Sequence, residues 1–254
     1  MLFALEFPPV SHLVNWPNLW GTDGMFAVNK VVLLFWAATI ITCAVFLLGR
    51  KGQLVPTGVQ NLAELAVEFI EKQIVLQTMG PQGLPFIPFL LTIFSFILTL
   101  NLIGLLPLVQ MPPNARIALP MFMAVLVWLI YNAMGILKNG FFGYFKHVLF
   151  PPGVPKALYI LVTPINFVSD IFVRPFALMV RLFANMLAGH LILVSFAVLS
   201  AALFDATKIG AIAPFALEIA LTGFEFLVAF LQAYIFTILA GVFIGLAMGS
   251  PDHH

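Results

Sequence analysis

Long apolar segments with almost no charge are the feature that most constrains this chain. Residues 28–48 (VNKVVLLFWAATIITCAVFLL) carry a single charge, near their start. A helix of that length spans about 30 Å of hydrocarbon at about 1.5 Å per residue. Of the 254 residues, 62% are hydrophobic and 8% are charged, whereas soluble domains carry about 25% charged residues. We therefore predict an all-α polytopic membrane protein.

The apolar segments predict about five membrane-embedded helices in one membrane domain that spans residues 1–254. After an outer N-terminal segment (1–27), the expected spans are 28–48, 85–107 and 117–137, followed by a long tilted hairpin of 164–204 and 211–249. The break in the hairpin comes at 205-DATKIG-210. No turn signal interrupts 176–204, which favours one long helix that Pro175 kinks near its start.

Residues 57–78 predict a different kind of helix. Glu64, Glu68 and Glu71 share one helical face. The opposite face is apolar and consists of Leu62, Leu65, Ala66 and Phe69. This pattern is typical of an amphipathic helix that lies along the membrane surface or on a neighbouring element.

The distribution of lysine and arginine predicts the orientation. One side of the membrane collects Arg50, Lys51, Lys72, Lys138, Lys146 and Lys156. The other side collects Lys30, Arg116 and Lys208. The richer side belongs in the cytoplasm. The N-terminus is then outside and the C-terminus cytoplasmic, as an odd number of spans requires.

Charge and cysteine content exclude several classes of function. The formal net charge is +1, so the chain has no basic footprint for nucleic acid. Its single cysteine, Cys43, excludes an intramolecular disulfide and argues against a cysteine-based metal site. The N-terminus has no basic region ahead of an apolar core, so we expect no cleavable signal peptide. We expect neither a metal nor a cofactor.

The last two apolar helices contain most of the polar groups that a membrane protein would avoid. They are Asp170, Arg174, Arg181, Asn185, His190, Glu218, Glu225 and Gln232. A charged side chain at the bilayer centre costs at least about 2.5–3.5 kcal/mol. Such a cost marks a functional site or a partner.

The turn near residue 207 predicts which of these groups meet. In an antiparallel hairpin, residues equally far from the turn lie at the same height. This pairs His190 with Glu225 and Arg181 with Gln232, each within one residue. His190 lies roughly 13 Å further toward the outside than Arg181 at about 1.5 Å per residue.

Two polar stations follow from this geometry. The outer station holds a histidine and a carboxylate, and both groups can exchange protons. The middle station holds Arg181 with Asn185 and Gln232 as amide neighbours. An arginine side chain stays protonated in proteins. It therefore does not relay protons readily but can repel a cation and stabilise a carboxylate, so a proton path that ends at the arginine has a gate.

At these residues the sequence resembles subunit a of the F-type ATP synthase. The resemblance is carried by 181-RLFANM-186 followed by Ala188-Gly189, by 231-LQAYIF-236 and by 101-NLIGLLP-107. It covers roughly residues 5–250 in the order and length of the helices. It implies a long tilted hairpin packed against a rotor, with two aqueous half-channels separated by the arginine.

The resemblance also implies roles for individual residues. Arg181 becomes the essential stator arginine that faces a rotor carboxylate, with Asn185 and Gln232 beside it. His190 and Glu225 become the proton-handling pair of the outer half-channel, a pair that is reversed in some members. Asp170 is a candidate for the inner half-channel and Glu218 is a possible lining residue. The chain departs from the family at Ala184, where glycine is common.

The partners implied by the resemblance are the c-ring of rotor subunits, the peripheral stalk subunit b, the lipid bilayer and protons. The acidic face of 57–78 is then either solvated or in contact with the stalk. The expected setting is a bacterial plasma membrane. The chain is expected to have no catalytic site of its own and to serve as the channel subunit of a proton-transporting rotary motor.

Two other classes of function compete with this interpretation. A proton-coupled secondary transporter needs a midplane site and usually internal repeats, and no repeat is visible here. An intramembrane hydrolase needs a serine within reach of His190. Ser195 lies about 140° around the helix from it, and Ser200 is the other candidate.

Structural alternatives remain for the site residues. Arg181 could be a buried cation paired with Glu225 or Asp170, and His190 could be a satisfied core histidine. Asn185 and Gln232 could serve only as interhelical hydrogen bonds.

Overall fold

Helices dominate the structure, a computed structural model that describes residues 18–20, 28–50, 57–106, 113–149 and 158–249. Five of its helical stretches are long and apolar enough to cross a membrane: Lys30–Gly49, Gly80–Gly104, Ala118–Asn139, Tyr159–Phe204 and Ile212–Met248. The predicted all-α polytopic fold is therefore confirmed. The outer N-terminal segment predicted for 1–27 lies almost entirely outside the described residues, as do Lys51 and Lys156.

The first membrane helix follows a short antiparallel pair of strands. Strand β1 (Asn18–Trp20) pairs with β2 (Val28–Asn29), with Asn18 opposite Asn29. Helix α2 (Lys30–Gly49) begins directly after β2. The Asn29 side chain caps it, because its Oδ1 accepts a hydrogen bond from the Val32 N–H at 3.1 Å.

The amphipathic segment consists of three helical pieces. They are α3 (Val59–Ile70), the π-helix η1 (Glu71–Val75) and α4 (Leu76–Thr78). The buried stripe contains Ala63, Ile70 and Ile74, whereas Leu62 and Leu65 are exposed. The helix therefore has a third, apolar face that points away from the protein, as expected at a membrane surface. On its acidic face, the ion pair with Lys72 lowers the pKa of Glu68.

The middle of the chain contains two membrane helices and an additional short helix. The elements are the 3-10 helix η2 (Gly80–Phe86), α5 (Ile87–Gly104), the 3-10 helix η3 (Pro113–Ala115), α6 (Ala118–Asn139) and α7 (Phe141–Leu149). Sequence reasoning treated 138–156 only as a connection and so missed α7. Gly140, with a φ of 72°, makes the turn between α6 and α7.

The long hairpin begins earlier than the sequence predicts. It comprises α8 (Tyr159–Val168), the π-helix η5 (Ser169–Val173), α9 (Arg174–Ala206) and α10 (Ile212–Met248). We expected its first helix to begin at residue 164, but Pro164 lies inside α8. The apolar run before Pro164 continues the helix, and the proline removes only one main-chain hydrogen bond near the helix start. Just before Pro175 the helix widens into the π-turn η5 and then continues as α9.

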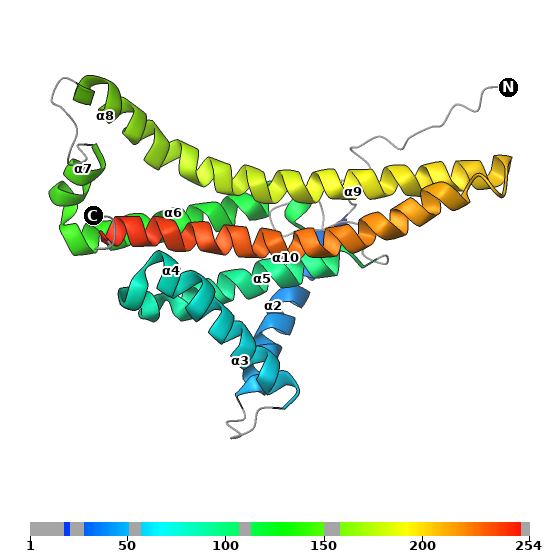
Figure 1. The fold of residues 1–254 in the computed structure, drawn as a ribbon, viewed down its shortest axis with the longest axis horizontal. Helices are drawn as coiled ribbons and strands as arrows, with labels where there is room; N and C mark the ends of the chain where they lie inside the picture. Colours follow the sequence, from blue (N-terminus) through cyan, green and yellow to red (C-terminus); the bar gives the residue numbers. More distant parts are fainter. Residues whose placement is uncertain (1–17, 21–27, 51–56, 107–112, 150–157, 250–254) are drawn as a thin grey trace. The chain divides into compact units, whose positions relative to one another are not determined.

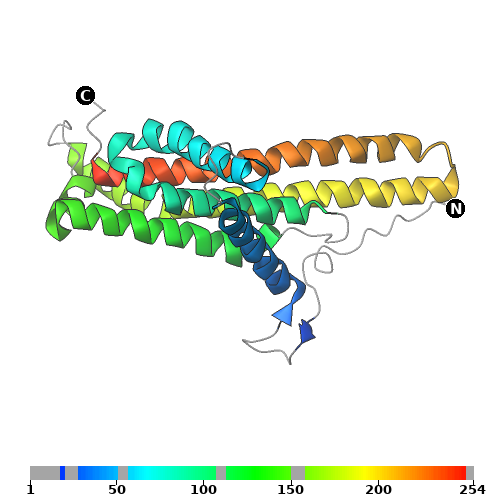
Figure 2. The same ribbon diagram turned by 90° about the horizontal axis from the view of Figure 1, so that it is seen from below.

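The chain divides into two compact units, and α2, α5, α9 and α10 contribute to both. Unit 1 comprises residues 1–44, 95–116 and 182–233, and unit 2 comprises 45–94, 117–181 and 234–254. In unit 1, α9 and α10 run side by side as an antiparallel hairpin (Figures 1 and 2). The buried core of unit 1 includes Ile97, Leu100, Leu182, Met186 and Ala229.

The core of unit 2 packs the surface helix against membrane helices. Fully buried side chains include Ile74, Leu90, Tyr131, Phe236 and Ile244. Glycines on α10 permit a close approach, since a Cβ on Gly245 would lie 2.5 Å from the Thr78 carbonyl oxygen. The amphipathic segment is thus anchored to α10 by backbone proximity.

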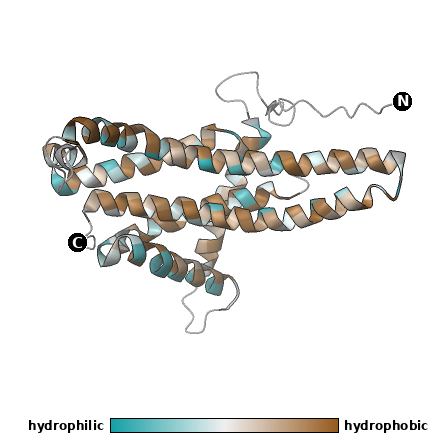
Figure 3. Cartoon of the chain, turned by 45° about the horizontal axis from the view of Figure 1, so that its top comes forward, coloured by the Kyte–Doolittle hydropathy of each residue, from teal (hydrophilic) through white to brown (hydrophobic). Residues whose placement is uncertain are grey.

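Large apolar side chains cover much of the outer surface of both units. Ile160 is 86% exposed and Trp36 is 58% exposed. Hydrophobic residues run along the long helices in Figure 3. Water would not tolerate so much exposed apolar area, so the surrounding solvent of these helices is lipid.

Gly135 provides a test of the packing between α6 and α7. A Cβ at this position would overlap the ring of Tyr144, which cannot swing away easily. We expect Gly135→Ala to lower the free energy of unfolding by about 1–3 kcal/mol. Thermal unfolding of the purified protein in detergent measures this change.

Gly143→Ala is the matched control for this substitution. Its added Cβ meets only Asn139 Cβ, at 3.8 Å, so unfolding should change little. Equal unfolding midpoints for the two alanine variants would contradict the packing described for Tyr144.

Candidate functional site

The hairpin of unit 1 sets the register between α9 and α10. At its tip, the Gly210 N–H donates to the Thr207 carbonyl at 2.8 Å, and the Ser200 hydroxyl lies 3.4 Å from the Ala211 carbonyl. Further from the turn, Gly189 faces Glu225, and Asn185 bonds to Gln232. Three cross-contacts therefore define which residues of α9 and α10 lie opposite one another.

Asn185 and Gln232 form a direct bond between the two helices. Asn185 Nδ2 donates to Gln232 Oε1 at 2.7 Å. Gln232 is 1% exposed, and its Nε2 finds no acceptor among the described residues. A buried donor left in this way costs about 1–3 kcal/mol. The Gln232 amide therefore keeps one donor that is not used within the described residues.

Glu225 and His190 occupy the next level toward the turn. Both are half-buried, and neither forms a hydrogen bond or ion pair within the described residues of unit 1. The carboxylate of Glu225 lies directly against Gly189, the neighbour of His190 in the chain. Because glycine has no side chain, it leaves the space that the carboxylate occupies. The hairpin thus brings two proton-exchanging groups to one height, as the distance from the turn predicts.

Glu218 lies closer to the hairpin tip and lines an open cavity. The cavity has a volume of about 610 Å³, and its polar lining comes from Ser200, Lys208 and Glu218. It is also lined by Phe204 and Phe215. A charged residue of each sign facing one opening is consistent with access for water at this end of α10.

Arg181 belongs to unit 2 and is exposed. Its guanidinium has no hydrogen-bond or ion-pair partner within the described part of that unit. The Asp170 carboxylate, one of the structural partners considered for it, is instead engaged by Arg174. An unpaired cation on an apolar membrane helix is costly unless something outside the chain neutralises it.

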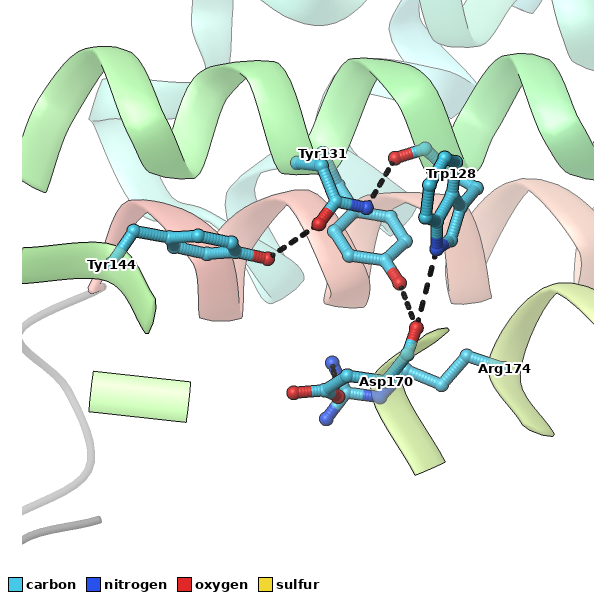
Figure 4. Close-up of polar contacts among 6 residues, drawn as sticks. Trp128, Tyr131, Tyr144, Asp170 and Arg174 are labelled. Atoms are coloured by element: carbon cyan, nitrogen blue, oxygen red, sulfur yellow. Dashed lines mark hydrogen bonds and ion pairs between the residues drawn. The ribbon is translucent and has the colours of Figure 1, made fainter. Parts of the chain in front are cut away.

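Asp170 is the centre of a polar cluster in unit 2 (Figure 4). Arg174 Nη1 lies 2.6 Å from Asp170 Oδ1, and the Arg174 guanidinium sits 5.3 Å from the centre of the Phe243 ring. Trp128 Nε1 and the Tyr131 hydroxyl both donate to the Asp170 carbonyl, at 3.3 and 2.6 Å. Asp170 is therefore held by contacts with residues of its own unit.

A second tyrosine completes this cluster from outside the spans. The Tyr144 hydroxyl donates to Asn132 Oδ1 at 3.0 Å. Burial, followed by the charge of Asp170, raises the pKa of Tyr144 to about 12. Its hydroxyl therefore remains a donor at all physiological pH values.

Sequence reasoning missed two polar networks. One is the set of aromatic donors on Asp170. The other joins Asn114 Nδ2 to Asn101 Oδ1 at 2.6 Å and Asn101 Nδ2 to the Ala229 carbonyl at 3.3 Å, all in unit 1. Asn101 is fully buried. A buried amide needs a hydrogen-bond partner, so an asparagine inside an apolar span could have indicated this network. Among the described residues, no cluster of His, Cys, Asp and Glu suits a metal ion.

Comparisons with known proteins all indicate the same family. Residues 31–245 match the family described as the ATP synthase A chain. The chain is 40% identical to the ATP synthase subunit a of Rhodococcus erythropolis (strain PR4 / NBRC 100887), over 98% of this chain and 90% of that protein. It is also 42% identical to the ATP synthase subunit a of Sinorhizobium medicae (strain WSM419), over 90% of this chain and 97% of that one.

Gly189 tests whether the glycine holds room for the Glu225 carboxylate. A Cβ at Gly189 would overlap Glu225 Oε1, so Gly189→Ala must push the carboxylate aside. Because the displaced group is the end of a flexible chain, we expect little change in stability and a changed carboxyl environment. Infrared difference spectra, with the carboxyl band assigned through Glu225→Gln, measure that environment.

The matched control is Gly223→Ala on α10, where an added Cβ meets nothing within 4 Å. Both substitutions replace a helical glycine by alanine, so both raise helix propensity equally. An identical Glu225 band in the Gly189→Ala and Gly223→Ala variants would refute the assigned contact.

Proposed function

The chain belongs to the ATP synthase subunit a family, and we propose that its Arg181 separates two half-channels that exchange protons with a rotor. The chain is an integral membrane subunit of the proton-translocating Fo stator. In the proposed arrangement a ring of c-subunits turns against α9 and α10, and a peripheral stalk subunit b holds the stator. The membrane is a bacterial plasma membrane, with the N-terminus outside and the C-terminus in the cytoplasm.

The observation that carries this proposal is the state of Arg181. It is an exposed cation on an apolar helix and lacks a partner within the described part of its own unit. A rotor carboxylate that moves past the helix would supply the missing opposite charge. Since an arginine keeps its proton, it attracts that carboxylate without offering protons a route of their own.

The outer half-channel uses the groups at the height of Gly189. A proton that enters from outside passes Glu218 at the cavity and then reaches Glu225 and His190. From there it protonates a rotor carboxylate, which can then face lipid because it is neutral. Asn185 and Gln232, bonded at 2.7 Å, keep the surface beside Arg181 polar but unable to exchange protons.

The inner half-channel releases the proton after the ring has turned nearly a full circle. Arg181 then stabilises the bare carboxylate and prevents a direct leak. A charge that crosses 100 mV releases about 2.3 kcal/mol, so several protons are needed per ATP and a leak would waste the gradient. The role of Asp170 in this path is limited by its ion pair with Arg174, and we assign it to the wall of the inner half-channel.

Removal of the guanidinium tests the role of Arg181. We expect Arg181→Ala to abolish proton-driven ATP synthesis and to leave or increase passive proton flow, because the barrier between the half-channels is lost. Synthesis and proton flux are measured with the whole enzyme in vesicles. Arg50→Ala, which removes an exposed arginine at the end of α2, is the control and should retain synthesis. Normal synthesis in Arg181→Ala would refute the proposal.

Exchange of the proton-handling pair tests the outer half-channel. Because His190 and Glu225 lie at one height on facing helices, we expect the double variant His190→Glu with Glu225→His to recover part of the ATP synthesis that each single variant loses. Gly189 leaves room beside α9 for the side chain at position 225. If the double variant is no more active than the worse single variant, the two residues do not act as a pair.

A further inference from the structure

A widened turn, η5, lies directly before α9, the helix that carries Arg181. In η5 the Arg174 N–H donates to the Ser169 carbonyl, five residues back, instead of the Asp170 carbonyl four residues back. If this five-residue spacing continued, the main-chain donor to the Asp170 carbonyl would be the N–H of residue 175. That residue is a proline and has no N–H. The Asp170 carbonyl is thus left without a main-chain donor in a membrane span.

Two aromatic side chains of α6 supply the missing donors. Tyr131 donates its hydroxyl at 2.6 Å, and Trp128 donates its indole N–H at 3.3 Å (Figure 4). The two residues are three positions apart, so they share one face of α6. Tyr131 is 1% exposed. In hydrocarbon an unpaired carbonyl is expensive, so this pair of donors makes the wide turn stable.

The side chains at the same turn are fixed as well. The ion pair of Asp170 with Arg174 spans η5 and the start of α9. The Phe243 ring of α10 lies against the Arg174 guanidinium. The turn is therefore held from both α6 and α10 within unit 2, and the α-helical path from Arg174 to Arg181 is continuous.

We propose that Trp128 and Tyr131 are positioning residues for Arg181, because they hold the wide turn that determines which face of α9 the arginine occupies. Returning the turn to α-helical geometry would rotate everything after it by about 100°, the angle of one residue. The arginine would then leave the face that meets the rotor. This inference rests on the function proposed above for Arg181.

The first experiment measures the rotation itself. In the assembled enzyme, Cys43→Ser removes the one native cysteine, and single cysteines are then placed at 176, 177, 178 and 179. Residues 176 and 177 are exposed and 178 and 179 are buried, so labelling with a small membrane-permeant maleimide should stop after 177. With Trp128→Phe and Tyr131→Phe present, we expect this boundary to move by one residue.

Tyr144→Phe is the matched control for the labelling. It removes a hydroxyl from a neighbouring tyrosine that bonds Asn132 rather than Asp170, so the boundary should stay in place. An unmoved boundary in the double phenylalanine variant would overturn the proposal. If the double variant does not assemble, Tyr131→Phe alone, which loses the shorter bond, decides the question in the same way.

The second experiment tests the cause of the rotation with a rescue. Pro175→Ala restores a main-chain N–H that can bond to the Asp170 carbonyl. We expect Tyr131→Phe to reduce proton-driven ATP synthesis at least threefold in the parent enzyme and by clearly less in the Pro175→Ala background. Equal fold losses in both backgrounds would overturn the proposal, since a merely structural hydroxyl has no reason to depend on that N–H.

These readouts separate the positioning role from the proposed function. The labelling boundary reports the rotation of α9 whether or not Arg181 acts on a rotor carboxylate. Normal synthesis in Arg181→Ala would remove the function and leave the labelling result intact. A fixed boundary together with an inactive Arg181→Ala would remove only the positioning role.

Discussion

Hydrocarbon offers no hydrogen bonds, and this constraint governs where polar groups lie in the membrane helices. The Asp170 carboxylate is paired with Arg174 and its carbonyl accepts from Trp128 and Tyr131, whereas Asn101 bonds to Asn114 and to the Ala229 carbonyl. Against this background, Arg181 stands out as an exposed cation. The two arginines of α9 thus differ. Arg174 pairs within the chain, whereas Arg181, seven residues later, is available to a partner outside it.

The register of the hairpin determines the order of the polar groups along it. Close contact at Gly189 gives the Glu225 carboxylate a defined place, and the Asn185–Gln232 bond lies further from the turn. The ionisable groups are therefore arranged along the hairpin rather than collected in one pocket. Such a linear order suits the passage of protons between stations, whereas a hydrolytic or metal site would need its groups to converge on one point.

Sequence reasoning found the fold and the approximate register of the hairpin because both depend on local patterns. Apolar length predicts the spans, and the distance from the turn predicts that Glu225 lies near His190. The partner of Gln232 was harder to predict. Side chains on a helix lean toward its N-terminus, which for α10 is the turn, so Gln232 reaches Asn185 rather than a residue at its own height.

The wide turn at Asp170 lay beyond sequence reasoning for a different reason. Pro175 suggests a kink, but the donors that replace its missing N–H come from α6, about 40 residues earlier in the chain. Nothing in the local pattern couples these segments. The same holds for Asn114 and Asn101, since only the folded chain brings a 3-10 turn and the end of a span together.

The Asn114–Asn101–Ala229 network has a mechanical consequence. In the arrangement proposed above, a turning ring would exert torque on the stator, and α10 lies in the hairpin that would receive this force. The buried amides tie the backbone of α10 at Ala229 to α5 and to the 3-10 turn η3. A sideways push on the hairpin is therefore shared with a second span through hydrogen bonds that no lipid can replace, which would hold the hairpin in place beside the proposed rotor.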